Sequence, residues 1–173
     1  MKKIAFILAA AVAAAALLAG CGKQEGDAPK GMKLASSDSV DYVMYVPEDW
    51  RVDQSELYTS AFYSSADATS ISASAYGAAV DETVDTWWDG FFKSFCSLYT
   101  DCSEPVREDA KLGGVDGARF EFSGVLNGQK YNYIMVACVR GGYVYYITYT
   151  STPDFYESHL DTLGEVIDNF SFR

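Results

Sequence analysis

Six segments of the chain show the alternating or β-prone pattern that is typical of strands. They are rich in Ser, Thr and aromatic residues, which fit a pleated, half-buried surface. They cover residues 40–46, 59–64, 69–76, 118–126, 129–140 and 143–151. The pattern therefore predicts a protein in which β-strands dominate.

The last three of these segments have the pattern of central strands. Asn127-Gly128 and a glycine pair at 141–142 separate them, and such pairs favour tight hairpin turns. Tyr145 falls on one face of the last strand and Tyr146 on the other, and the neighbours on both faces are also apolar. Strands that are apolar on both faces lie in the middle of a sheet that is covered twice.

Two further segments carry apolar residues at helical spacing. Asp81 offers an N-cap for the first helix, and Thr152 followed by Pro153 offers a cap for the second. The first stripe consists of Val84, Trp88, Phe91, Phe92, Phe95 and Leu98, and the second of Tyr156, Leu160, Leu163, Ile167 and Phe170. Both stripes need a core to face. The predicted class is therefore α+β, an antiparallel β-sheet flanked by helices.

The amino terminus has the pattern of an export signal. A basic start at Lys2 and Lys3 precedes the apolar run 4–18, which is too short to span a bilayer. The run ends in Leu18-Ala19-Gly20-Cys21, which resembles the lipobox of bacterial lipoproteins. In that family the cysteine is acylated, and cleavage makes it the first residue of the mature protein. The alternative is an ordinary signal peptide with an incidental cysteine.

These observations divide the chain into three parts. Residues 1–20 form a lipoprotein signal peptide, 21–37 a lipidated Cys21 with a flexible polar tether, and 38–173 a single globular domain. The implied location is the cell membrane or outer membrane, with the domain on the extracytoplasmic side. The implied partner is the membrane itself, through the lipid on Cys21.

The charge excludes several function classes. The whole chain has a formal charge of −11, and residues 38–173 carry 22 acids against 8 bases, or −14. So acidic a domain lacks the positive surface that nucleic-acid binding requires, and it is a poor polybasic membrane binder. Its own field should hold it away from anionic lipid.

Three motifs in this order resemble the PsbP-like family, named for an extrinsic subunit of photosystem II. They are Val-Pro-Glu-Asp-Trp at 46–50, Gly-Gly-Val-Asp-Gly-Ala at 113–118, and Ile-Asp-Asn-Phe-Ser-Phe at 167–172. The resemblance covers residues 38–173 and implies an α-β-α sandwich. The family includes many bacterial lipoproteins, and its members with known roles are mostly binding or assembly proteins. The resemblance carries no catalytic motif to positions of this chain.

The three cysteines beyond Cys21 have separate interpretations. Cys96 and Cys102 are six positions apart, and such a pair in an exported domain favours a disulfide. Cys138 lies on a predicted central strand between Ala137 and Val139, which is typical of a small buried hydrophobe. Pairing of Cys138 with Cys96 or Cys102 stays open at this point.

The sequence offers no catalytic constellation. His159, the single histidine, falls beside acids on the second helix, which favours a solvated position. One histidine cannot build a His-based metal cluster, and no phosphate-loop or dinucleotide motif is present, so no metal and no cofactor is expected. Acids at 81, 82, 85 and 89 crowd one helix start, where the simple interpretation is a capped helix end and the alternative is a weak cation site.

Trp87 is the candidate ligand-binding residue. Adjacent helical residues point about 100° apart, so Trp87 should lie at the edge of the stripe that Trp88 centres. An edge tryptophan is usually packing, and the alternative is a stacking platform for a sugar or a partner.

Three hypotheses about function follow. The first is a non-enzymatic binding module on the envelope that contacts an unknown envelope protein. The second is a receptor for a small ligand, a glycan or a lipid. The third is an envelope hydrolase with two carboxylates, for which a pair of buried carboxyl groups about 5–9 Å apart would be required.

Overall fold

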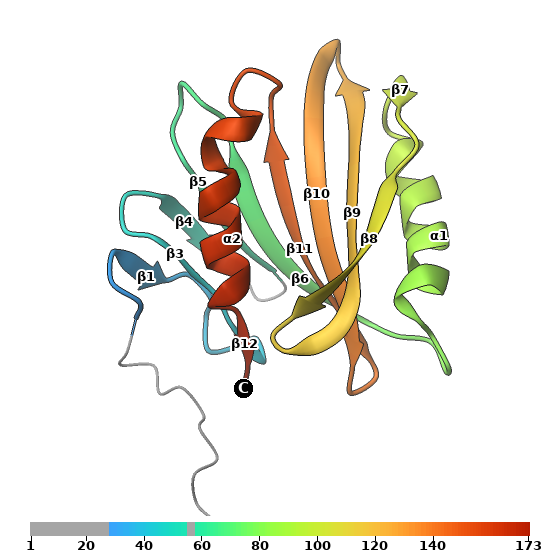
Figure 1. Ribbon diagram of the computed structural model, residues 1–173, viewed down its shortest axis with the longest axis horizontal. Helices are drawn as coiled ribbons and strands as arrows, with labels where there is room; N and C mark the ends of the chain where they lie inside the picture. Colours follow the sequence, from blue (N-terminus) through green and yellow to red (C-terminus); the bar gives the residue numbers. More distant parts are fainter. Residues whose placement is uncertain (1–27, 55–57) are drawn as a thin grey trace, which may run out of the picture.

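A computed structural model describes residues 28–54 and 58–173 of the chain. The predicted signal peptide and the predicted acylation site at Cys21 lie outside the described residues. The described residues fold around one large antiparallel sheet, shown in Figure 1.

The large sheet contains eight strands. Their order across the sheet is β4 (Arg51–Gln54), β5 (Tyr58–Phe62), β6 (Ser70–Gly77), β11 (Tyr143–Ser151), β10 (Gln129–Arg140), β9 (Val115–Leu126) and β7 (Asp101–Cys102), with β8 (Val106–Leu112) also paired to β9. Two short pairs accompany it, β1 (Met32–Leu34) with β3 (Tyr45–Pro47) and β2 (Tyr42–Val43) with β12 (Ser171–Phe172). The helices are α1 (Val84–Cys96), the 3-10 helix η1 (Tyr156–His159) and α2 (Leu160–Asp168).

The central hairpins form where the sequence predicts them. Asn127 and Gly128 have φ of 52° and 82°, the left-handed values that a two-residue hairpin turn requires. In contrast, strand β8, which precedes the turn at Gly113-Gly114, was not predicted. Gly117 lies inside β9, where a Cβ atom would come within 1.9 Å of the backbone oxygen of Ala137. This glycine is needed for a close approach of two strands rather than for a turn.

Each face of the sheet has its own core. Alternate residues of β10 divide between them: Ile134 and Val136 belong to the larger core, and Tyr133 and Met135 to the smaller. The larger core includes Leu163 and Val166 of α2 together with residues of β1, β2 and β3. In the smaller core, helix α1 contributes its one fully buried residue, Trp88. The prediction that the central strands are covered twice is thus confirmed.

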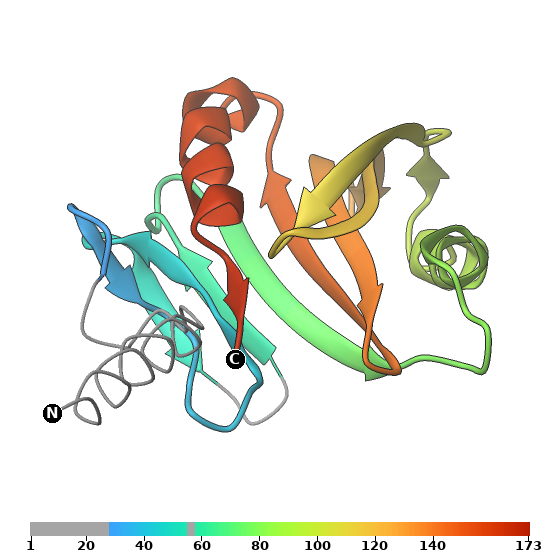
Figure 2. The ribbon, with the colours of Figure 1, turned by 60° about the horizontal axis from the view of Figure 1, so that its bottom comes forward.

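The α+β class is confirmed, but the expectation that helices flank the sheet is too general. Helix α1 packs mainly on β9 and β10, as Figure 2 shows at the β9 end of the sheet. On the other face α2 shares the cover with the short strands β1, β2, β3 and β12. The sheet therefore extends beyond the helices that pack on it.

The predicted tether ends earlier than residue 37. Met32 pairs with Pro47, and Met32, Ala35 and Ser36 are at most 6% exposed. The hydroxyl of Ser36 accepts a hydrogen bond from the backbone nitrogen of Met44 at 3.1 Å. A three-residue strand is too short to give a periodic hydrophobic pattern. The sequence pattern therefore did not predict that residues 28–37 belong to the domain.

The helix ends differ from those expected. Asp81 has φ of 62°, which is incompatible with an N-cap, and Thr83 caps α1 in a reciprocal capping box with Thr86. Leu98 lies beyond the end of α1 and is 70% exposed. Thr152 begins a turn and not a helix, since η1 and α2 start only at residues 156 and 160. No helix within residues 28–54 and 58–173 has the length and apolarity that crossing a membrane requires.

Candidate functional site

One half of the α1 face of the sheet is left open. Tyr146 of β11 belongs to the smaller core and contacts Trp87 of α1, so its side chain lies on the α1 face. Thr148 and Thr150 follow at steps of two and point to the same side. No described helix or strand covers this face over β5, β6 and the second half of β11 (Figure 2).

Strand register places hydroxyl groups opposite one another on this open half. Ser60 of β5 is opposite Ser72 of β6, and Ser72 is opposite Thr148 of β11. Ser70 is likewise opposite Thr150. Directly opposed residues of an antiparallel pair share a face. We call these five residues, Ser60, Ser70, Ser72, Thr148 and Thr150, the hydroxyl face.

The hydroxyl groups of the hydroxyl face make no hydrogen bond with any other described residue. The clearest case is Ser60, whose side chain is only 6% exposed. Its neighbour Thr59 points to the larger core, where its hydroxyl accepts a hydrogen bond from Tyr42 at 3.3 Å. The other four residues are partly exposed, and among the described residues Tyr45, not a member of this face, carries the buried hydroxyl that lacks a partner. The five hydroxyls are therefore accessible to solvent and available to an external partner.

Aromatic rings border the hydroxyl face on the α1 side. The ring of Trp87 lies 5.2 Å from that of Tyr146 and 4.8 Å from that of Phe91. Tyr146 in turn lies parallel to Tyr76, with centroids 5.9 Å apart, and Tyr76 is 57% exposed. Trp87 is half-buried, whereas Trp88 stacks on Phe120 at 3.8 Å inside the core. The structure thus places the candidate residue Trp87 in an aromatic group that ends at the surface.

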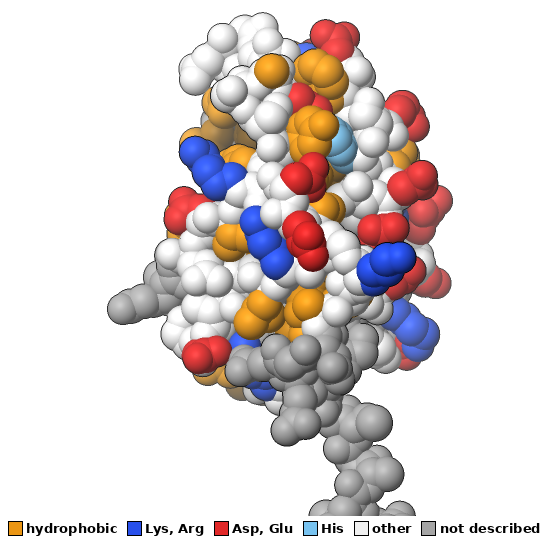
Figure 3. Space-filling view, turned by 90° about the vertical axis from the view of Figure 1, so that its left-hand side faces the viewer, with side chains coloured by type: hydrophobic (Ala, Val, Ile, Leu, Met, Phe, Trp, Pro, Cys, Tyr) orange, Lys and Arg blue, Asp and Glu red, His pale blue; other side chains and the backbone are white. Residues whose placement is uncertain are grey.

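The hydroxyl face lies apart from the acidic side of the domain. The five residues of the face and its aromatic border carry no charge, and at the β4 edge the exposed Asp53 is directly opposite Ser60. Exposed acids follow η1 and α2, which pack on the opposite face of the sheet. They are Asp154, Glu157, Asp161, Glu165 and Asp168. Figure 3 shows acidic side chains gathered along one side of its view.

His159 is buried, so the prediction that it is solvated is wrong. Its Nε2 lies 2.8 Å from Oδ2 of Asp67, and its ring packs 4.4 Å from Tyr63 and 5.6 Å from Trp50. The hydroxyl of Thr69 donates to the other oxygen of Asp67 at 2.6 Å. The reason for the burial is the tertiary contact with the β5–β6 hairpin, which fills the end of the larger core.

Asp67, which is buried, and Glu121, which is half-buried, are both used by the fold. Burial by itself would raise the pKa of Asp67, but hydrogen bonds from Thr69 and His159 outweigh it and lower the pKa. The pKa of Glu121 is lowered in the same way, because hydrogen bonds from Tyr156 and Arg119 outweigh the effect of burial. Both groups are held ionised by structural partners, so neither has the free, raised-pKa carboxyl group that acid catalysis needs.

The acids at the start of α1 do not gather into a cation site. Asp85 forms an ion pair with Arg107 of β8 at 2.7 Å, and Glu82 accepts a hydrogen bond from the backbone of Ala79. Within the described ranges no group of three or more His, Cys, Asp or Glu residues could hold a metal ion.

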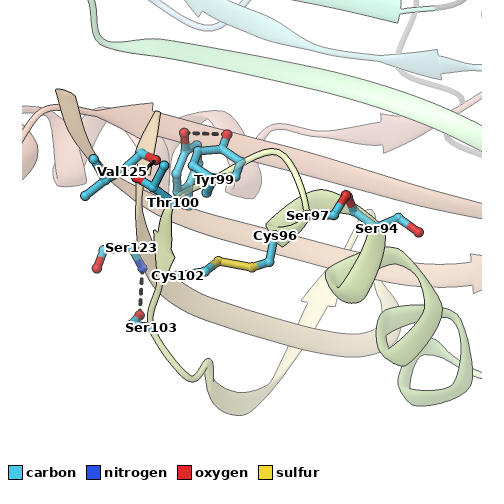
Figure 4. The surroundings of a disulfide bond; sticks show 10 residues. Ser94, Cys96, Ser97, Tyr99, Thr100, Cys102, Ser103, Ser123 and Val125 are labelled. Carbon is cyan, nitrogen blue, oxygen red and sulfur yellow. Dashed lines mark hydrogen bonds between the residues drawn. A yellow bond between two sulfur atoms is a disulfide. The ribbon is translucent and has the colours of Figure 1, made fainter. Parts of the chain in front are cut away.

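A disulfide joins Cys96 and Cys102. It connects the end of α1 to the edge strand β7, as Figure 4 shows. Beside it the hydroxyls of Tyr99 and Tyr133 lie 2.8 Å apart, so the same loop is fixed to β10. Cys138 is buried and free, and burial raises the pKa of its thiol to about 11. This thiol is therefore protonated and unreactive at neutral pH.

Of the site residues considered from the sequence, only Trp87 borders the hydroxyl face. The five hydroxyl residues were missed. Their signal was present, because Ser70, Ser72 and Ser74 occur at a period of two in a predicted strand. Serine at three successive positions on one face of an inner strand indicates a face that is neither core nor charged surface.

Comparison of the structure with solved structures shows the class of fold. It is a PsbP-like and Mog1-like fold, in which an antiparallel sheet dominates over two helices. No protein-family model matches the sequence, and no curated protein matches it.

Three structural neighbours represent this class. The cyanobacterial PsbP protein of Synechocystis has a TM-score of 0.62 at 12% identity, covering 86% of this chain and 96% of its own. LpqN of Mycobacterium tuberculosis, described as involved in cell envelope biogenesis, has 0.59 at 16%, covering 81% and 89%. The Ran-binding protein Mog1p of Saccharomyces cerevisiae has 0.60 at 10%, covering 82% and 95%.

Proposed function

We propose that this protein is a lipid-anchored, non-enzymatic binding module on the extracytoplasmic side of the cell envelope. The observation that carries the proposal is the uncovered half of the α1 face, where five hydroxyls have no partner inside the described domain. Binding through this face uses groups that the fold itself does not need.

The anchor proposal rests on the lipobox at Cys21 and is supported by the likeness to LpqN, an envelope protein. The described domain begins at Ala28, and six residues lie between it and Cys21 in the sequence. Seven peptide steps can reach at most about 25 Å. The domain is therefore held closer to the membrane than a tether of 16 residues would allow.

Photo-crosslinking in cells tests the binding surface. A benzoylphenylalanine introduced at Ser72 reports on the hydroxyl face, and the same residue at Thr162 of α2 is the matched control on the opposite side of the sheet. We expect adducts, with protein or with glycan, from position 72 and none from position 162. Adducts from position 162 alone would contradict the proposal.

The anchor has its own test. A Cys21→Ser variant should lose incorporation of an alkyne-labelled fatty acid and move from the membrane fraction to the soluble fraction. Equal labelling of the variant and the wild-type protein would exclude Cys21 as the acylated residue.

A further inference from the structure

We infer that the hydroxyl face binds a neutral glycan, with the sugar chain lying across β5, β6 and β11. This inference rests on the proposed function and adds to it the chemical class of the ligand. It is based on the spacing of the free hydroxyls, the aromatic border and the absence of charge among the five hydroxyl residues.

The hydroxyl groups form a regular grid. Neighbouring strands are about 4.8 Å apart, and successive residues on one face of a strand are about 7 Å apart. Ser60, Ser72 and Thr148 therefore form one row across three strands, and Ser70 and Thr150 form a second row beside it. Each Ser or Thr hydroxyl both donates and accepts. A sugar chain presents hydroxyls of the same dual character at repeated intervals, so one chain can pair with several positions.

The aromatic border supplies the second half of a sugar site. Tyr76 is mostly exposed and lies parallel to Tyr146, which contacts Trp87. A ring with one solvent-facing side can cover the apolar C–H face of a sugar while its polar atom stays hydrated. Hydroxyl groups at the centre and rings at one edge match the two kinds of surface that a pyranose has.

The charge of the site and of the domain argues against other ligands. A lipid acyl chain needs an apolar groove, whereas the centre of this face is lined by hydroxyls. An anionic polymer would be repelled by a domain of −14 and by Asp53, which is directly opposite Ser60. Arg51, a basic residue at the same edge, lies over the ring of Phe62. A basic peptide would prefer the exposed acids of η1 and α2 on the opposite face. A neutral polyhydroxyl chain meets none of these obstacles.

Calorimetric titration of the full-length protein in a sugar-free zwitterionic detergent tests the inference. The probes are cellohexaose, chitohexaose and laminarihexaose, with an alginate hexasaccharide as the anionic comparison. The test variant combines Ser72→Ala and Thr148→Val, which remove two hydroxyls and keep the shape of the strand. Thr162→Val on α2 is the matched control.

We expect at least one neutral hexasaccharide to bind, and the double variant to weaken that binding about tenfold or more because two hydrogen bonds are lost. Thr162→Val should bind as the wild type does. Since the two hydroxyls bond to nothing in the described domain, the melting temperature of the double variant should stay unchanged, which excludes misfolding as the cause.

Two results would overturn the inference: no neutral hexasaccharide binds the wild-type protein, or binding is equally strong in the double variant. Preference for alginate would also contradict it. Crosslinks from Ser72 to a protein, together with no binding of any hexasaccharide, would leave the binding module in place and remove the glycan. Loss of both the crosslinks and the sugar binding would remove both proposals.

Discussion

Two buried tyrosines of the larger core differ in whether the side-chain hydroxyl has a hydrogen-bond partner. The hydroxyl of Tyr149 donates to the backbone oxygen of Tyr156 at 2.7 Å. The hydroxyl of Tyr45 is equally buried and has no hydrogen-bond partner among the described residues. An unpaired buried hydroxyl carries a desolvation penalty of about 1–3 kcal/mol.

We therefore predict opposite effects of the same substitution at these positions. Tyr45→Phe should raise the free energy of unfolding by about 1 kcal/mol, and Tyr149→Phe should lower it by a similar amount. Urea unfolding at pH 7 measures both. A loss of stability in both variants would show that the Tyr45 hydroxyl has a partner in solution.

The network around Asp67 makes stability depend on pH. The pKa of Asp67 is lowered from its ordinary value of 3.8, because hydrogen bonds from Thr69 and His159 outweigh the opposing effect of burial. A carboxyl whose pKa is lower in the folded state stabilises the fold above about pH 4, and this contribution disappears as the pH falls through the folded pKa. We predict that Asp67→Asn flattens the decline of unfolding free energy between about pH 4 and pH 2.

The exposed Asp161→Asn is the matched control and should leave that decline unchanged. Chemical unfolding at several pH values compares the three proteins. The same slope in Asp67→Asn as in the wild type would contradict the assignment.

Residues whose role depends on distant partners could not be predicted. Asp67 and His159 are 92 positions apart, and nothing near His159 in the sequence distinguishes it from an exposed helix residue. Trp88 was predicted correctly as a core residue, because its role follows from local helical periodicity.

At the scale of elements, the local residue pattern decides which strands can be predicted from the sequence. Asn127-Gly128 between apolar runs predicts the hairpin β9–β10. The sequence does not predict strand β8, because four of its seven residues are charged and most of the strand is exposed. It exists because it pairs with β9 along its length and because Arg107 binds Asp85 of α1. Such a strand is specified by its partners and not by its own pattern.

The disulfide gives a prediction for α1 and β7. Closing a loop of about seven residues stabilises the fold by about 2 kcal/mol in the chain-entropy model. We predict that a variant with Cys96→Ala and Cys102→Ala loses about that much unfolding free energy. Thermal unfolding measures it.

A reducing agent provides the control for this experiment. It should lower the melting temperature of the wild-type protein to that of the double variant and leave the variant unchanged. If reduction does not affect the wild-type protein, the disulfide contributes nothing to stability. Cys138, buried and free, is the same in both proteins.

At the scale of the whole molecule, the sheet has two unequal covers. The larger core joins α2 and four short strands to the sheet, while among the described elements only α1 packs on the smaller core. The unequal cover produces the hydroxyl face. Its position could not be predicted, because β6 lies beside β11 only through a pairing of residues about 70 positions apart.

The unequal cover also predicts that the domain opens in two steps. Helix α1 packs on the smaller core through its buried Trp88 and several partly buried aromatic residues, and the disulfide fixes its end. This smaller cover should detach before the larger core unfolds. Trp88→Ala removes a buried aromatic side chain, a change that costs about 3–5 kcal/mol. Hydrogen exchange should then accelerate in α1 and β7 far more than in β5 and β6.

Leu163→Ala in the larger core is the control and should accelerate exchange throughout the domain. Uniform acceleration by Trp88→Ala would instead show a single cooperative unit, in which the open half of the sheet is as firmly held as the covered half.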